Sequence, residues 1–143
     1  MPNNTFKQHA RRYYEKINLG EFDNEYFALF ADDVEIFYPK FGFAYGHAAV
    51  KTLGERVQSA VSRFGFDLDK FIYTAENNRV AVEISEYGTT TGGKDFPDNK
   101  VSFGKFCNVF EFNTQGKISR YHCYGDPDYA GDDKERVAIF AQK

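Results

Sequence analysis

The sequence has few of the residues that typify secreted proteins and metalloproteins. Its 143 residues include no tryptophan, one methionine and only two cysteines, Cys107 and Cys123. Two such cysteines form neither a disulfide framework nor a paired-cysteine metal motif, so we expect two free thiols in a reducing compartment. The three histidines are not spaced as metal ligands, and we expect neither a metal nor another cofactor.

Basic stripes and long apolar runs are also missing. The formal net charge is -3, and lysine and arginine form no stripe, which argues against nucleic-acid binding. The first ten residues, MPNNTFKQHA, lack the apolar centre of a secretory signal, and no apolar run is long enough to span a bilayer. We therefore expect a cytoplasmic protein that contacts neither nucleic acid nor a membrane.

Aromatic residues, by contrast, are abundant. The chain has 16 phenylalanines and 10 tyrosines, an aromatic fraction of 18% within a hydrophobic fraction of 42%. A chain of this length forms one domain with a substantial core. Because large exposed aromatic patches are uncommon on soluble monomers, these side chains must line a core, a cavity or an interface.

Apolar periodicity predicts three helices in the first half of the chain. Phe6, Ala10, Tyr13 and Ile17 lie on one face of a helix over 4–18, which Gly20 ends. Further helices are expected over 21–31 and 46–65. Between them, residues 34–38 alternate as a short strand that ends before a proline, and 40–46 form a loop.

The second half alternates in the way that strands do. Strands are expected over 66–76 and 79–90, around an Asn-Asn turn, and over 101–112 and 117–124, around the turn NTQG. Residues 125–143 are expected to add a short helix. The sequence therefore predicts a single α+β domain over 1–143, with three N-terminal helices packed on one face of a curved antiparallel sheet.

Three strings carry a resemblance to a known family. NLGEFDNEYFALFADDVEIFYP, YGHAAV and FCNVFEFNTQGKISRYHCYGDP resemble the nuclear-transport-factor-two-like superfamily, in its SnoaL-like polyketide cyclase and ketosteroid isomerase-related branch. The resemblance covers nearly the whole chain. It implies a cone in which the helices and the sheet enclose a pocket for a small hydrophobic ligand, and it implies a homodimer through the sheet.

The resemblance also implies catalytic positions. Ketosteroid isomerases hold an oxyanion with a tyrosine on the first helix and an acid on the penultimate strand, and these positions match Tyr13 and Asn108. Their catalytic carboxylate matches Tyr38, which is a poor base at neutral pH. The acid/base aspartate of the cyclases matches Asp126. Asp126 and Pro127 are, however, also the sequence of an Asp-Pro turn. Tyr13 equally suits a core position.

The inward face of the last strand depends on the turn before it. Without a bulge, Asn108 faces Tyr121, and Tyr121 and Cys123 point inward. One extra residue brings His122 inward instead, as a candidate base. The predicted catalytic set is therefore Tyr13, Asn108, Asp126 and His122, and the predicted substrate-binding set is Tyr14, Tyr38, Phe106, Phe110 and Tyr121.

A third comparison, with epoxide hydrolases, disfavours their chemistry. Their paired arginine and aspartate fall here on Ile84 and Glu86, so the arginine is missing. We expect cofactor-free isomerisation, cyclisation or dehydration of a small hydrophobic carbonyl compound. The alternative is a non-catalytic binding or carrier module, or an association domain. Tyr38 in place of the usual carboxylate favours this alternative, because binding needs donors but no base.

Overall fold

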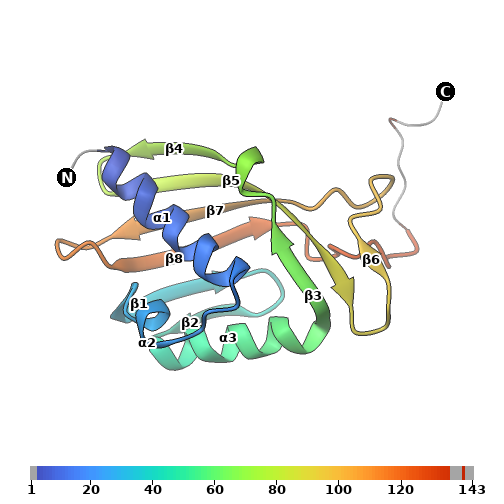
Figure 1. The fold of residues 1–143 in the computed structure, drawn as a ribbon, viewed down its shortest axis with the longest axis horizontal. Helices are drawn as coiled ribbons and strands as arrows, with labels where there is room; N and C mark the ends of the chain where they lie inside the picture. The colour runs from blue at the N-terminus through green and yellow to red at the C-terminus, as the bar shows by residue number, and fades with distance from the viewer. Residues whose placement is uncertain (1–2, 136–139, 141–143) are drawn as a thin grey trace.

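The computed structural model describes residues 3–135 and residue 140 (Figure 1). Three helices, α1 (Asn3–Asn18), α2 (Asn24–Phe27) and α3 (His47–Ala60), lie against one face of an open sheet. The eight strands are β1 (Phe30–Tyr38), β2 (Gly42–Tyr45), β3 (Val61–Phe66), β4 (Ile72–Glu76), β5 (Arg79–Thr90), β6 (Asp95–Phe96), β7 (Lys105–Phe112) and β8 (Ile118–Gly125). This arrangement confirms the predicted α+β class. Within the described residues, no helix combines the length and apolar character needed to cross a bilayer.

The sheet is mixed, whereas the sequence predicted a wholly antiparallel one. Its order is β2-β1-β8-β7-β5-β3, and β4 and β6 also pair with β5. All neighbours are antiparallel except β1 and β8, which run parallel. The exception arises because β1 and β8 come from opposite ends of the chain and meet through a long connection.

Strand β5 bends the sheet around the helices. Its first part pairs with β4 and β7, and its last residues extend beyond β7 to pair with β3 and β6. The change of partners falls at Glu86, whose N–H donates to the carbonyl of Gly104 at 2.9 Å. Gly104 has a φ of 64°, and a Cβ there would collide with the carbonyl oxygen of Glu86. Glycine at position 104 therefore permits the close approach that fixes Glu86.

Several predicted boundaries were wrong, and hydrogen bonding explains two of them. The second helix is a single turn, capped by Asp23, because the carbonyl of Leu29 already accepts from Ile118 of β8 at 2.8 Å. The third helix begins after its cap Gly46, as expected, but ends at Ala60 because β3 pairs with β5 from Val61 onward.

Other expected elements differ in extent. The expected loop at 40–46 contains β2, which pairs with β1, and residues 101–104 precede the strand that they were expected to join. The expected strand over 66–76 is interrupted by a 3₁₀ turn, η1 (Leu68–Lys70). The described part of the expected C-terminal helix, 126–135, contains turns and no helix; apart from residue 140, the rest lies outside the described residues.

Candidate functional site

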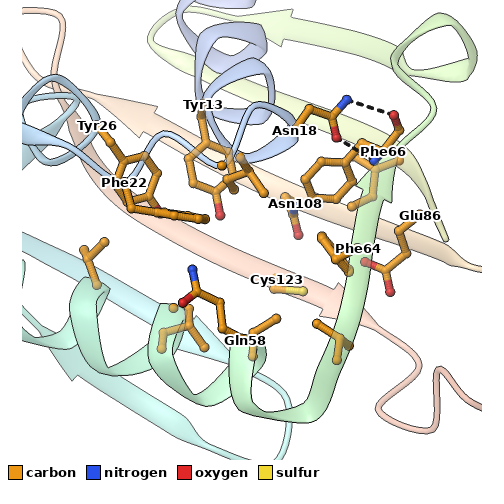
Figure 2. A pocket seen from close by; sticks show the side chains of 18 of the residues that line it. Tyr13, Asn18, Phe22, Tyr26, Gln58, Phe64, Phe66, Glu86, Asn108 and Cys123 are labelled. Atoms are coloured by element: carbon orange, nitrogen blue, oxygen red, sulfur yellow. Dashed lines mark hydrogen bonds between the residues drawn. The ribbon is translucent and has the colours of Figure 1, made fainter. Parts of the chain in front are cut away.

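A cavity of about 420 Å³ lies between the helices and the inner face of the sheet (Figure 2). Side chains from α1, α3 and five strands line it, and most of them are apolar. Its polar side chains include Tyr13, Tyr38, Arg63, Glu86, Asn108 and Tyr121. A cavity of this size and character is suited to a small, mostly apolar molecule.

The pairing of β7 with β8 decides which side chains face this cavity. Asn108 pairs with Cys123 and Phe110 pairs with Tyr121, so the predicted pairing of Asn108 with Tyr121 was wrong by two residues. The pair Phe112–Ile118 next to the turn is already one residue away from the predicted register, and a bulge at Ser119 adds the second residue. Because a shift of two residues preserves the face of a strand, Tyr121 and Cys123 still point inward.

His122 consequently lies on the opposite face, and its predicted placement at the pocket was wrong. Its Nε2 is 2.7 Å from Oε2 of Glu35, and its Nδ1 is 3.2 Å from the Tyr124 hydroxyl. The rings of Phe37 and Phe43 cover it, each with its centroid 5.7 Å from that of the imidazole. A base at this position has no access to the cavity.

Asn108 presents one unpaired polar atom. Its Nδ2 donates to the hydroxyl of Tyr14 at 2.7 Å, while its Oδ1 is buried without a hydrogen-bond partner among the described residues. Only 2% of Asn108 is exposed. A buried acceptor without a partner is costly. A rotation of the amide would exchange the two groups and leave Nδ2 unpaired instead, so either orientation leaves one amide group for a ligand.

Two residues of the predicted substrate-binding set lie behind the cavity wall. Tyr14 is fully buried and contacts Asn108 from the side of α1, and Phe110 is fully buried in the core. Neither lines the cavity, whereas Tyr38, Phe106 and Tyr121 do, as predicted. Tyr14 therefore holds Asn108 from behind the cavity wall.

Tyrosine hydroxyls cluster at the α1 side of the cavity. The rings of Tyr13 and Tyr121 lie 5.3 Å apart and those of Tyr13 and Tyr26 lie 6.1 Å apart. Burial raises the pKa of Tyr13 well above its ordinary value, and hydrogen bonding to Tyr121 only partly opposes this. These phenols therefore stay protonated at neutral pH and are available as hydrogen-bond donors.

Glu86 is the one carboxyl group on this wall, and it lies outside both predicted sets of site residues. Glu86 is 8% exposed, and no described side chain forms a hydrogen bond or ion pair with its carboxyl group. Burial raises the pKa of Glu86 to about 8. The sequence carries a signal for it: Val80, Val82, Ile84 and Glu86 share one face of an alternating strand, so an acid lies within a buried row.

The buried Lys16 fixes the segment that closes one side of the cavity. Its ammonium group donates to Glu21, Asp23 and Glu25, each at 3.1 Å. The same segment contributes Leu19, Gly20 and Phe22 to the cavity lining. This cluster of one cation and three carboxylates therefore holds the segment against α1.

A second cavity, of about 360 Å³, adjoins the first. The two share six lining residues, Tyr38, Val57, Val61, Phe64, Glu86 and Phe106. Asp126 lines only the second cavity. Its Oδ1 accepts a hydrogen bond from the Asp128 amide at 2.9 Å, which agrees with the alternative prediction of an Asp-Pro turn. Among the residues described, no three histidines, cysteines or acids gather as metal ligands.

Comparisons with known proteins identify the fold. No protein-family model and no curated protein matches the sequence. Solved structures do match. An NTF2-like protein of unknown function from Burkholderia pseudomallei K96243 has a TM-score of 0.72 at 18% identity, covering 85% of this chain and 91% of its own.

Two further solved structures have names that mention a ligand or a reaction. A provisionally assigned polyketide cyclase from Xanthomonas campestris pv. campestris has a TM-score of 0.70 at 20% identity, covering 87% of this chain and 92% of its own. TerC, co-crystallized with polyporic acid, has a TM-score of 0.70 at 16% identity, covering 85% and 92%. At these identities the likeness establishes the fold and not the activity. The chain has the NTF2-like α+β cone fold, as the sequence resemblance implied.

Proposed function

We propose that this protein binds a small, largely apolar carbonyl compound in the first cavity and that Glu86 moves a proton on it without a cofactor. The observation that carries this proposal is a carboxyl group, without a described partner, on the wall of an apolar cavity. Because burial raises the pKa of Glu86 to about 8, a minor ionised fraction is present at neutral pH as a base, and the protonated form is an acid.

The proposed step is a proton transfer in both directions. The Glu86 carboxylate takes a proton from the carbon beside the ligand's carbonyl. The electron pair of that C–H bond forms a C=C bond with the carbonyl carbon, and the C=O π pair passes to the oxygen. Protonated Tyr38, which lines the same wall, and Tyr13 donate hydrogen bonds to the enolate oxygen. Where the ligand carries a C=C bond next to that carbon, the Glu86 acid returns the proton to the far carbon of the resulting dienolate, which shifts the double bond and completes an isomerisation.

Asn108 has a different role in this scheme from the one expected. In the orientation that donates from Nδ2 to Tyr14, the atom that lacks a partner is Oδ1, which accepts hydrogen bonds. It therefore suits a hydroxyl group on the ligand and orients it, while tyrosines serve as donors to the developing charge. Asp126, on the second cavity only, takes no part in this proton transfer.

Hydrogen-deuterium exchange tests this function without knowledge of the natural substrate. Tetralone, an apolar bicyclic ketone, exchanges the hydrogens beside its carbonyl through an enolate, and NMR in deuterated buffer follows the loss. We expect wild type to accelerate exchange and Glu86→Gln to lose about a hundredfold or more of that acceleration. Glu83→Gln, an exposed acid on the opposite face of β5, is the matched control. Equal exchange by wild type and Glu86→Gln would refute the proposed role of Glu86.

A carrier without catalysis is the second candidate. Tyr38 on β1 supports it, since it supplies a donor where the related isomerases hold a carboxylate. Binding of tetralone without any acceleration of exchange would favour the carrier. An association domain with a pocket filled by its own side chains is disfavoured by the cavity of about 420 Å³.

We further propose a homodimer through the outer face of the sheet. Three aromatic residues are exposed on β2 and β8: Phe43 by 61%, Tyr45 by 64% and Tyr124 by 48%. Together with the half-buried Phe37 they form what we call the outer aromatic patch. Large exposed aromatic patches are typical of interfaces.

A further inference from the structure

We propose that the second cavity is a subsite for a carboxylate, so that the ligand is an elongated acid whose apolar part fills the first cavity. This inference rests on the proposed function, because it places the apolar part of the ligand there. The two cavities meet at the wall formed by Tyr38, Glu86 and Phe106. A ligand longer than one ring system would extend past Glu86 into the second cavity.

Arg56 is positioned over the second cavity by a stack of rings. Tyr38 and Phe41 stack with centroids 5.5 Å apart and planes at 16°, and the Arg56 guanidinium carbon lies 5.9 Å from the centroid of Phe41. The rings of Tyr38 and Phe41 therefore link the wall shared by both cavities to the guanidinium group of Arg56. A guanidinium group held over an aromatic ring is oriented in advance, and its planar donors match the two oxygens of a carboxylate.

The charges around the second cavity favour an anion. Arg56 and Lys40 both line it, and neither forms an ion pair with a described residue. Asp126 opposes them, but one of its oxygens already accepts the Asp128 amide. Glu86 adds little negative charge at neutral pH, because burial raises its pKa to about 8. Two cations therefore face one aspartate and a mostly neutral acid.

The first cavity offers no comparable anion site. The one arginine on its wall, Arg63, has its Nε donating to Thr89 at 3.2 Å, and one of its terminal nitrogens lies 3.9 Å from Asp95. Its charge is thus already partnered. A carboxylate on the ligand is consequently directed to Arg56, and a ligand hydroxyl is directed to the unpaired amide oxygen of Asn108 in the first cavity.

A matched pair of probes tests the subsite by calorimetric titration at neutral pH. Hydroxybiphenyl carries the apolar part and one hydroxyl, and hydroxybiphenylcarboxylic acid adds a carboxylate at the far end. We expect wild type to bind the acid about tenfold more tightly than the neutral compound. Arg56→Gln should lose most of that gain and leave the affinity for the neutral compound unchanged. Lys51→Gln, on the same helix but outside both cavities, should match wild type.

Added salt provides a second criterion, since it should weaken binding of the acid and not of the neutral compound. Equal affinities of wild type for the two probes, or an equal change for both in Arg56→Gln, would overturn the carboxylate subsite while leaving the apolar cavity supported. Failure of both probes to bind wild type would instead count against the ligand-binding function itself. The carboxylate subsite, which rests on that function, would then be refuted as well.

Discussion

The outer and inner faces of the sheet differ in whether their polar groups have partners. On the outer face, Glu35 accepts from Arg120 at 3.3 Å and lies 2.7 Å from His122, so its charge is matched. On the inner face, Glu86 and the Oδ1 of Asn108 have no described partner. Hydrogen bonding to His122 lowers the pKa of Glu35, whereas burial raises that of Glu86. Polar groups with partners stabilise a fold, and those without partners are available to a ligand.

The largest effect should come from removing the unpaired acid. The pKa of Glu86 rises from an ordinary 4.5 to about 8 on folding, so the folded protein holds a proton that the unfolded chain has lost. Wild-type stability therefore falls as pH rises between those values, and Glu86→Gln abolishes this fall. We expect Glu86→Gln to exceed wild type by several kcal/mol at pH 9, at about 1.4 kcal/mol per pKa unit, and to equal it near pH 4.

Urea denaturation between pH 4 and pH 9 measures this difference, with Glu83→Gln as the control. Glu83 is exposed on the opposite face of the same strand, so its variant should follow wild type throughout. If the stability of Glu86→Gln paralleled that of wild type at every pH, the buried acid would not be held neutral by its surroundings.

The next largest effect concerns the outer aromatic patch. Phe43→Glu places a charge at its centre, and burying that charge in a dimer interface would be costly. We expect sedimentation to show a twofold lower mass for Phe43→Glu than for wild type at the same concentration. Phe103→Glu is the control, since Phe103 is 55% exposed in the loop before β7. A monomeric wild type, or equal dissociation by both variants, would contradict a dimer through this face.

A smaller effect, of opposite pH dependence, is expected at Glu35. Its lowered pKa means that the ionised form is favoured on folding, so this stabilisation is present above the ordinary pKa and is lost as pH falls through the lowered value. Because its side chain is 34% exposed, we expect Glu35→Gln to cost only about 1 kcal/mol at pH 7. The cost should vanish in acid, where Glu86→Gln also matches wild type. If Glu35→Gln lowered the free energy of unfolding by the same amount at every pH, the charge of Glu35 would not be the source of its stabilisation.

Much of the fold could be predicted because local signals and packing agree. The apolar face of α1 is a regular helical stripe, and Asn77 takes the positive φ of 54° that its hairpin turn needs. The boundary between α3 and β3 could not be placed, because apolar residues around Val61 suit either a helix or a strand. Only pairing with β5 selects the strand there.

The candidate site was predicted in part for a similar reason. Strand alternation places Phe106 and Asn108 on one face, and the match to the isomerase carboxylate pointed to Tyr38. Tyr121 faces inward because the register differs from the predicted one by an even number of residues. The position of His122 depends on a bulge that no local signal marks. Glu86 was not predicted, because strand alternation places it in a buried row but does not show that a cavity lies in front of it.

The smallest effect on stability is expected at Asn108. Asn108→Leu removes a buried acceptor without a partner, but it deprives the Tyr14 hydroxyl of its bond at 2.7 Å. Each unsatisfied group costs about 1–3 kcal/mol, so the two changes nearly cancel. The double variant Asn108→Leu/Tyr14→Phe removes both polar groups, and we expect it to be at least as stable as wild type. Both variants should bind hydroxybiphenyl about tenfold more weakly, because its hydroxyl loses an acceptor.

Urea denaturation and calorimetric titration of the same preparations separate the two roles of this amide. A double variant that is clearly less stable than wild type would show that the Asn108–Tyr14 pair stabilises the core, as the paired groups of the outer face do. Full stability together with weakened binding would show that the inner face retains a costly polar atom for its ligand. The two faces would then differ in what their polar groups are for and not only in where those groups lie.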